Sequence, residues 1–258
     1  MFNEINTFIT QIKKDKPLVL NLTNDVTMDF IANGLLSLGA SPIMSQAEEE
    51  MADLIKISQA IVVNLGTLNA RFINLCEHAC KIANQLRKPI ILDPVGAGAS
   101  QYRTHTSQQF IKNYHIDIIR GNASEIMALY DATTTSKGVD SSTGSHDAIT
   151  SAQALANLTQ ATIVISGATD VIVANNTIQY CTRGSALMPM VTGTGCLFSA
   201  VVGAFRAVND NSFAAAHAAT VFYAVCGEIA AQRAQTPGMF KTQFIDALYA
   251  LPSEQHYA

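Results

Sequence analysis

The sequence has 258 residues and a mass of 27.6 kDa, a length that suits one large α/β domain or two small ones. Hydrophobic residues make up 48% of it and charged residues 14%, a composition that excludes an intrinsically disordered chain. The net charge of −4 excludes the basic surface that nucleic-acid or anionic-membrane binding requires. Any phosphate chemistry must therefore use backbone amides and a few placed cations.

Short apolar segments alternate along the chain with longer amphipathic ones. The apolar segments predict strands at 18–22, 60–65, 89–93, 116–120, 162–166, 171–174 and 177–181. The amphipathic segments predict helices at 2–14, 25–37, 48–58, 69–87, 106–113, 123–130, 147–157, 195–208, 212–233 and 241–250. This alternation predicts an α/β fold, with a mostly parallel sheet covered by helices on both faces.

The other features of organisation concern the sheet edge, one long loop and the domain count. The Asn175-Asn176 pair between two β-branched runs predicts a hairpin at an edge of the sheet. The polar segment 131–147 is long enough to be a lid or a disordered tip. Without a repeat or a long linker, residues 1–258 are expected to form one domain.

Two uncharged stretches, 184–205 and 211–227, are the candidates for a membrane span. The first is interrupted by Pro189 and several glycines, and the second is rich in alanine, so both suit a tightly packed core better than a bilayer. The five cysteines are odd in number and the first residues lack a signal-peptide pattern. We therefore expect a cytoplasmic protein with reduced thiols and no membrane segment.

Polar residues follow nearly every predicted strand. These junctions are Asn21 to Asn24, Asn64 to Thr67, Asp93 to Gly98, Arg120 to Asn122, and Ser166 to Ala168. In an open α/β sheet, ligands bind outside the carboxyl ends of the strands. Each junction alone is also ordinary turn chemistry, but the five together predict a polar rim.

The segment 191–196, Val-Thr-Gly-Thr-Gly-Cys, is called the glycine loop below. It precedes an apolar helical run, so its amides lie at a helix N-terminus, an arrangement that binds anions. The alternative is a turn that only introduces a core helix. Neither a Walker A motif nor a GxGxxG fingerprint occurs, and no GxSxG sequence or histidine spacing points to a hydrolase or a zinc enzyme.

Three charged residues at the strand ends are candidates for chemistry. Asp93 ends an apolar strand, while Glu125 follows Asn122 by three residues, which fits either a helix capping box or Mg²⁺ binding beside a polyphosphate. Arg120 ends a run of isoleucines, where a cation needs an anionic partner. That partner is either a phosphate or a neighbouring carboxylate.

Several motifs in one order resemble the hydroxyethylthiazole kinase family. They are Thr23-Asn24, Ala32 to Met44 (ANGLLSLGASPIM), Asn64 to Thr67 (NLGT), Pro89 to Gly98 (PIILDPVGAG), Arg120 to Ile126 (RGNASEI), Gly138 to Asp140 (GVD), Thr192 to Cys196 (TGTGC) and Val201 to Phe205 (VVGAF). The resemblance covers about residues 17–235. It implies a three-layer ribokinase-like fold and a homotrimer with active sites at the subunit interfaces.

The resemblance also implies an enzyme of thiamin salvage, which moves the ATP γ-phosphoryl group to the hydroxyl of 4-methyl-5-(2-hydroxyethyl)thiazole with Mg²⁺. The implied roles are thiazole binding for Asn24, Met44 and Gly193, ATP binding for Arg120 and Ser166, Mg²⁺ binding for Asp93 and Glu125, and catalysis by the anion hole of Gly193, Thr194, Gly195 and Cys196. Ser166 stands where the family usually has Thr, which keeps the hydroxyl.

Cys196 occupies the place at which the wider superfamily has a catalytic Asp. A thiol at a helix N-terminus is expected to have a lowered pKa and to act as a weak base or to shape the pocket. The alternatives are a related kinase of a hydroxymethylpyrimidine or a sugar and, in another class, a non-catalytic binding protein on the same fold.

Overall fold

The computed structural model describes residues 2–130 and 145–257. The strands are β1 (Leu18–Leu22), β2 (Ser41–Met44), β3 (Ala60–Asn64), β4 (Ile90–Asp93), β5 (Ile118–Asn122), β6 (Thr162–Ser166), β7 (Asp170–Ala174) and β8 (Thr177–Cys181). The helices are α1 (Phe2–Asp15), α2 (Met28–Leu38), α3 (Met51–Ile57), α4 (Ala70–Gln85), α5 (Gln101–Asn113), α6 (Ala123–Tyr130), α7 (Ser145–Thr159), α8 (Thr194–Arg206), α9 (Ser212–Arg233) and α10 (Pro237–Ala250). Short 3₁₀ turns lie at Glu48–Glu50, Met188–Met190 and Glu254–Tyr257.

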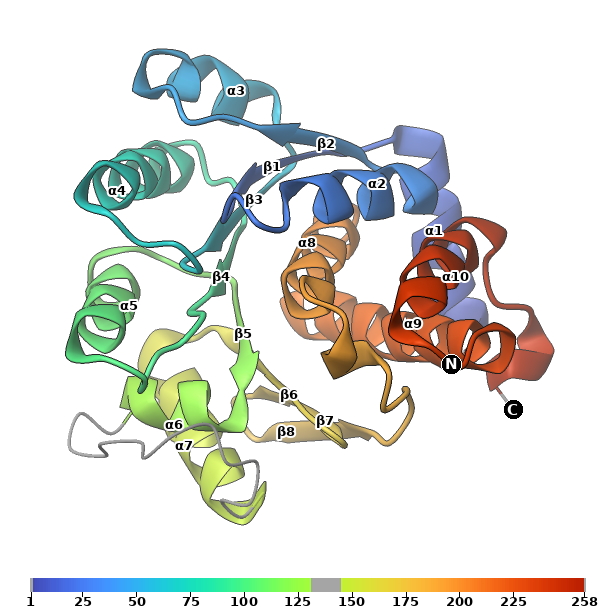
Figure 1. The fold of residues 1–258 in the computed structure, drawn as a ribbon. Helices are drawn as coiled ribbons and strands as arrows, with labels where there is room; N and C mark the ends of the chain where they lie inside the picture. The colour runs from blue at the N-terminus through green and yellow to red at the C-terminus, as the bar shows by residue number, and fades with distance from the viewer. Residues whose placement is uncertain (1, 131–144, 258) are drawn as a thin grey trace.

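All eight strands belong to one sheet, in the order β2-β1-β3-β4-β5-β6-β7-β8. The pairs from β2 to β6 are parallel, and β7 and β8 pair antiparallel as the hairpin at one edge. Helices α1, α2, α8, α9 and α10 lie on one side of the sheet and α3 to α7 on the other (Figure 1). The predicted three-layer α/β architecture is confirmed.

The strands are apolar along their whole length because both faces of the sheet are covered. In β3, Ala60 and Val62 belong to the core on the α8 side, and Ile61 and Val63 to the core on the α4 side. Successive side chains of a strand point to opposite faces, so a sheet between two helical layers selects apolar residues at every position. This arrangement leaves only the strand ends free for polar residues.

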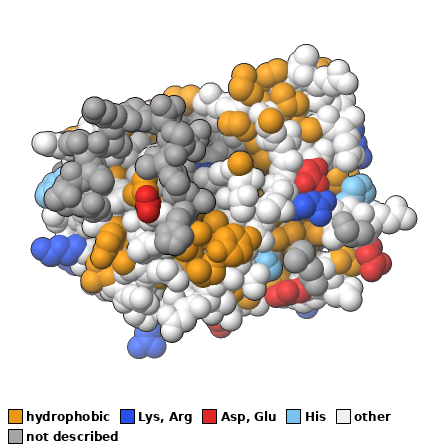
Figure 2. All heavy atoms as spheres, turned by 90° about the horizontal axis from the view of Figure 1, so that it is seen from below, with side chains coloured by type: hydrophobic (Ala, Val, Ile, Leu, Met, Phe, Trp, Pro, Cys, Tyr) orange, Lys and Arg blue, Asp and Glu red, His pale blue; other side chains and the backbone are white. Residues whose placement is uncertain are grey.

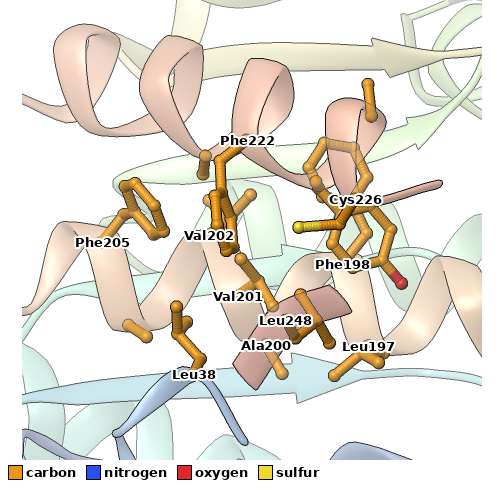
Figure 3. Packing of buried hydrophobic residues seen from close by; sticks show 14 of the residues in the cluster. Leu38, Leu197, Phe198, Ala200, Val201, Val202, Phe205, Phe222, Cys226 and Leu248 are labelled. Atoms are coloured by element: carbon orange, nitrogen blue, oxygen red, sulfur yellow. The ribbon is translucent and has the colours of Figure 1, made fainter. Parts of the chain in front are cut away.

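Helix α9 is the one described helix long and apolar enough to cross a membrane, but 78% of its most apolar window is buried inside the molecule. It packs against α8 and α10. Figure 3 shows Phe222 and Cys226 of α9 against Val202 and Phe205 of α8. A helix that is apolar all round is expected at such a central place, so its composition reflects burial in the core.

Several elements differ in their bounds from the predictions made from sequence: β5 spans Ile118–Asn122 and not 116–120, for example, and α10 begins at Pro237 and not at 241. Two further differences have a clear physical reason. Strand β2 has no counterpart among the predicted strands, because Pro42 lies within its four residues; an edge strand tolerates proline since one of its sides forms no ladder. Helix α5 begins at Gln101 and not at 106, because Ser100 caps it by accepting a hydrogen bond from the Arg103 amide. The start of the helix is polar, and apolar periodicity alone overlooks it.

The charged residues of the surface also fit the composition. On the face shown in Figure 2, the lysines and arginines are scattered singly and do not gather in one patch. Of the predicted lid segment 131–147, residues 131–144 lie outside the described part of the chain, and 145–147 begin α7.

Candidate active site

The carboxyl ends of β1, β3, β4, β5 and β6 lie side by side in the sheet. The register places Asn64 opposite Asp93 and Asn122 opposite Ser166. The glycine loop and the first turn of α8 approach the same ends, since Cys196 Sγ accepts a hydrogen bond from Asn24 Nδ2 at 3.3 Å. Parallel strand order thus brings together residues that are up to 172 positions apart in the sequence.

Asp93 is fully buried, with 0% of its surface exposed. Its Oδ2 accepts hydrogen bonds from Asn64 Nδ2 and Ser199 Oγ, each at 2.8 Å. Its Oδ1 is buried and has no partner among the described residues. Burial raises the pKa of Asp93 to about 6; Glu125 adds to the rise, whereas Arg120 and the two hydrogen bonds lower it. This carboxylate has an oxygen left for a ligand.

Arg120 is held beside Asp93 without forming a close pair with it. Its Nη1 lies 3.6 Å from Asp93 Oδ2, its Nη2 donates to Ser166 Oγ at 2.6 Å, and its guanidinium lies 5.2 Å from the centre of the Phe198 ring. Its Nε is buried without a partner among the described residues. Both alternatives from the sequence therefore apply in part: a carboxylate neighbours Arg120, yet the guanidinium keeps donor capacity for a phosphate.

Glu125 forms the reciprocal capping box that its spacing from Asn122 predicts. Its Oε2 accepts from the Asn122 amide at 2.7 Å, while Asn122 Oδ1 accepts from the Glu125 amide at 2.8 Å. Its Oε1 accepts from the Gly96 amide at 2.8 Å, which ties the loop after β4 to α6. The cap leaves both oxygens with further lone pairs, so it is compatible with a ligand.

The two carboxylates fit a Mg²⁺ ion of the kind that polyphosphates carry. The described residues hold no group of three or more His, Cys, Asp and Glu side chains that suits a metal. Mg²⁺ is usually held by one or two carboxylates, with phosphate oxygens and water completing its shell. Asp93, with its unpartnered Oδ1, and Glu125, which acts on the pKa of Asp93, supply that number.

The glycine loop needs glycine at two positions. Gly193 has φ +95°, a backbone conformation that side chains disfavour, and a Cβ there would lie 3.0 Å from Thr27 Cγ2. A Cβ on Gly195 would lie 2.9 Å from Arg120 Nη1, so the guanidinium packs directly on the loop. Both glycines thus allow the close approach that an anion site requires.

Two amides in the first turn of α8 are available for an anion. The Thr194 amide donates to Val191 O, and the Thr194 hydroxyl donates to Met188 O and Val191 O, so this side chain is used within the loop. The next two amides, of Gly195 and Cys196, have no acceptor among the described residues, as is usual in the first turn of a helix. These amides, with the helix dipole behind them, are the donors of the candidate anion hole.

The pKa of the Cys196 thiol is raised, and not lowered as the helix N-terminus predicts. Burial is the largest cause, the charge of Asp93 adds to it, and hydrogen bonds from Asn24, Thr27 and Asn64 only partly oppose it. The expectation of a lowered pKa was wrong because it ignored the burial of the thiol and, in second place, the charge of Asp93. At neutral pH the thiol is protonated.

Asn24 and Met44 lie on the β2 side of the site. Asn24 Nδ2 donates to Asn64 Oδ1 at 2.9 Å, and Asn24 Oδ1 accepts from Thr27 Oγ1 at 3.0 Å, so this side chain joins the network around Asp93. Met44 is half-buried at the end of edge strand β2, opposite Asn21, and takes no part in that network. The apolar end of the site therefore lies at the margin of the sheet.

A pocket of about 260 Å³ opens between the ends of β1 and β3 and the start of α4. It is lined by Thr23, Asp25, Gln46, Thr67, Leu68, Asn69, Arg71, Phe72, Leu75 and Arg103. Thr23 and Thr67 of the predicted polar rim line it, but none of the residues to which the resemblance assigns a role does. The surroundings of Asp93 are the better candidate for the reaction centre than this pocket. There a buried carboxylate lies beside Arg120, a donor with an N–H unpartnered among the described residues.

Sequence reasoning missed the residues of α8 that support the site. Ser199 and Phe198 lie in an apolar helical run, which by itself indicates only core packing. Their spacing offered one signal: 198 and 199 follow the glycine loop by less than one helical turn, so they stay close to the strand ends. Arg103, which donates to Leu65 O, Gly66 O and Val95 O and so ties together two of the loops, gave no such signal.

Comparisons with known proteins agree with this geometry. The profile of the hydroxyethylthiazole kinase family matches residues 9–254. The hydroxyethylthiazole kinase of Chlamydia caviae is 42% identical over 252 residues, which cover 97% of this chain and 95% of that protein. The chain belongs to the hydroxyethylthiazole kinase family.

Solved structures agree with the family in fold. The hydroxyethylthiazole kinase of Pyrococcus horikoshii OT3 superposes with a TM-score of 0.90 at 36% identity, covering 98% of this chain and 95% of that one. A ribokinase-like superfamily protein from Enterococcus faecalis V583 superposes with a TM-score of 0.67 at 14% identity, covering 92% of this chain and 87% of that one. The ribokinase-like fold implied by the motifs is confirmed. The resemblance to the hydroxyethylthiazole kinase family is confirmed with it.

Proposed function

We propose that this member of the hydroxyethylthiazole kinase family transfers the γ-phosphoryl group of ATP to the hydroxyl of 4-methyl-5-(2-hydroxyethyl)thiazole in thiamin salvage. One observation carries the proposal: a buried carboxylate with an oxygen unpartnered among the described residues lies 3.6 Å from Arg120, whose guanidinium lies against Gly195 in the first turn of α8. Phosphoryl transfer passes through a loose transition state, so it needs positioning and charge stabilisation more than covalent chemistry.

The proposed donor side is formed by β5, β6 and the start of α8. Arg120 and Ser166, which already share a hydrogen bond, contact the ATP phosphates. The amides of Gly195 and Cys196 stabilise the charge on the moving phosphoryl group, and Gly193 and Thr194 hold the loop in place. Asp93 and Glu125 are the side chains that would hold Mg²⁺, which when bound neutralises phosphate charge.

The proposed acceptor side is formed by Asn24, Met44 and Gly193. Asn24 places an amide beside Cys196, and Met44 offers a polarisable apolar surface to a sulfur heterocycle. The thiol of Cys196, protonated at neutral pH, shapes this side of the pocket, and only its small thiolate fraction is able to take up the acceptor proton. A loose transition state tolerates that weakness, because the proton leaves late.

The test is ADP release by the purified protein with MgATP and hydroxyethylthiazole, run beside hydroxymethylpyrimidine, ribose and a reaction without acceptor. We expect ADP release that depends on the thiazole and is lost in Asp93→Ala. Turnover with one of the other acceptors would identify a related kinase. Thermal stabilisation by ATP without product from any acceptor would favour the binding-protein alternative.

We also propose a homotrimer whose active sites lie at subunit interfaces, acting in the cytoplasm. Two features support the assembly: Met44 lies on an edge strand, and Val26, two residues after Asn24, is 72% exposed although apolar. A partner subunit would cover both. Light scattering coupled to gel filtration should give three times 27.6 kDa, and a monomer with full activity would contradict the shared site.

A further inference from the structure

Tyr223 lies in the middle of α9, is 2% exposed, and supports the glycine loop from the core side. Its hydroxyl donates to the backbone carbonyl of Thr194 at 2.7 Å. Burial raises the pKa of Tyr223 well above its ordinary value, so the phenol remains a donor throughout the usable pH range. Tyr223 thus holds the Thr194 carbonyl, in the first turn of α8, in a fixed position.

The carbonyl of Thr194 and the amide N–H of Gly195 belong to the same peptide group. A trans peptide is planar, so its C=O and N–H point in fixed, opposite directions. Holding the Thr194 oxygen therefore also aims the Gly195 N–H, one of the two amides in the first turn of α8 without an acceptor among the described residues. A hydrogen bond accepted by the carbonyl also polarises the peptide and strengthens its N–H as a donor.

The ring of Tyr223 supports Arg120 through the ring of Phe198. It stacks on Phe198 with ring centres 5.0 Å apart and an interplanar angle of 13°, and Phe244 closes it from the other side at 4.8 Å, edge to face. The Arg120 guanidinium lies 5.2 Å from the centre of the Phe198 ring. Figure 3 shows Phe198 at the packed interface between α8 and α9.

We propose that Tyr223 is a positioning residue for phosphoryl transfer, which fixes the Gly195 amide through the Thr194 carbonyl and supports Arg120 through the Phe198 ring. This inference rests on the proposed function. Tyr223 lies in the core and touches no substrate. Its effect on the transition state is exerted through the Gly195 amide and Arg120. Because the aimed donor matters most when charge develops on the moving phosphoryl group, loss of the hydroxyl should lower kcat more than it raises either KM.

The decisive variant is Tyr223→Phe, which keeps the ring and removes only the hydroxyl. The matched control is Thr220→Val on the same helix, because it removes another fully buried hydroxyl, which donates to Ala216 O within α9 at 2.7 Å and not to the glycine loop. We expect kcat of Tyr223→Phe to fall about 10-fold, as for the loss of one well-placed hydrogen bond, with each KM within about twofold. Thr220→Val should keep the wild-type kcat.

A second readout does not depend on turnover. Aluminium fluoride bound beside MgADP mimics the phosphoryl group in the transition state. The increase in MgADP affinity when aluminium fluoride is added therefore reports on the anion hole. We expect Tyr223→Phe to lose about 10-fold of that tightening while its affinity for MgADP alone stays unchanged. Calorimetric titration of wild type and both variants measures this.

The outcomes separate this inference from the proposed function. If the wild type turns over thiazole and Tyr223→Phe keeps its kcat and its fluoride tightening, the positioning role is overturned and the proposed function stands. If the wild type shows no thiazole turnover but tightens with fluoride, loss of tightening in Tyr223→Phe still supports the positioning role. A wild type that binds neither MgADP nor its fluoride complex overturns both.

Discussion

The two ends of helix α8 each meet an arginine–aspartate pair, and the pairs differ in how completely their polar groups are used. At the C-terminal end, Arg206 Nη2 lies 2.9 Å from Asp117 Oδ1, and Asp117 Oδ2 accepts from the Ile90 amide. At the N-terminal end, Arg120 and Asp93 stay 3.6 Å apart, with Asp93 Oδ1 and Arg120 Nε unpartnered among the described residues. The first pair has its polar groups satisfied within the fold, whereas the second keeps hydrogen-bonding capacity for a ligand.

Buried charges that are incompletely paired cost stability, so their presence calls for a reason. At the C-terminal end of α8, the Arg206 cation is also stabilised by the negative end of the helix dipole. At the N-terminal end, Arg120 lies beside a carboxylate whose pKa burial raises, so this carboxylate is itself hard to ionise. The difference supports the proposal that a highly charged ligand binds at the carboxyl ends of the strands and completes the pairing there.

The largest expected effect comes from breaking the incomplete pair. Asp93→Ala should lower thiazole-dependent kcat by about 1,000-fold or more, because charge stabilisation in a water-excluded site cannot be restored by solvent. ADP release under saturating substrates measures it. Asp117→Asn serves as the matched control at the other end of the sheet and should keep kcat. An Asp93→Ala enzyme within tenfold of wild type would remove Asp93 from the chemistry.

Breaking the complete pair should affect folding and spare catalysis. Arg206→Ala leaves Asp117 buried without its cation, and the two side chains are only 13% and 10% exposed. We expect the free energy of unfolding to fall by about 3 kcal/mol, with kcat per folded molecule unchanged. Urea unfolding and ADP release on the same sample test this. A lowered kcat at unchanged stability would contradict the division of labour between the two pairs.

The raised pKa of Asp93 predicts a pH dependence of stability. Its folded pKa of about 6 lies above the unfolded value near 3.9, so the folded state holds the proton more tightly. This contribution is fully present below about pH 4, is lost as pH rises through about 6, and amounts to about 3 kcal/mol. Asp93→Asn should therefore gain stability relative to wild type as pH rises from 4 to 7, even though it loses activity.

The control for this titration is Asp170, whose pKa burial also raises to about 6. Unfolding free energies of wild type, Asp93→Asn and Asp170→Asn, measured from pH 4 to 7.5, separate the two groups. If the unfolding free energies of Asp93→Asn and wild type change with pH in parallel, Asp93 does not change its protonation state between pH 4 and 7.5. The predicted pH-dependent loss of stability would then be wrong.

The smallest effect is expected at Cys196. Because its pKa is raised, the thiol is protonated at neutral pH and supplies little base. Cys196→Ala should keep turnover within about tenfold of wild type, consistent with loss of a weak general base. Initial rates across pH 6–9 give the comparison. A complete loss of turnover with unchanged substrate affinity would establish Cys196 as an essential base.

Much of the fold and part of the site could be predicted from the sequence. The strand ends at Asn64, Asp93, Arg120 and Ser166 stood out because an apolar strand that ends in a polar residue is a local pattern. The glycine loop was equally local, since only backbone freedom explains two glycines before an apolar helix. Ser199 and Tyr223 could not be predicted as parts of the site, because a polar group inside a buried helix has no local signature of its partner.

The sequence by itself determined the alternation of strands and helices, the polar rim and the motifs of the hydroxyethylthiazole kinase family, because each depends on residues close together in the chain. The tertiary structure decided the electrostatics. It buried Cys196 and placed it near Asp93, and both effects raise the thiol pKa; it also left Asp93 and Arg120 incompletely paired among the described residues. Such effects depend on burial and on distances across strands, and neither quantity is contained in any stretch of sequence.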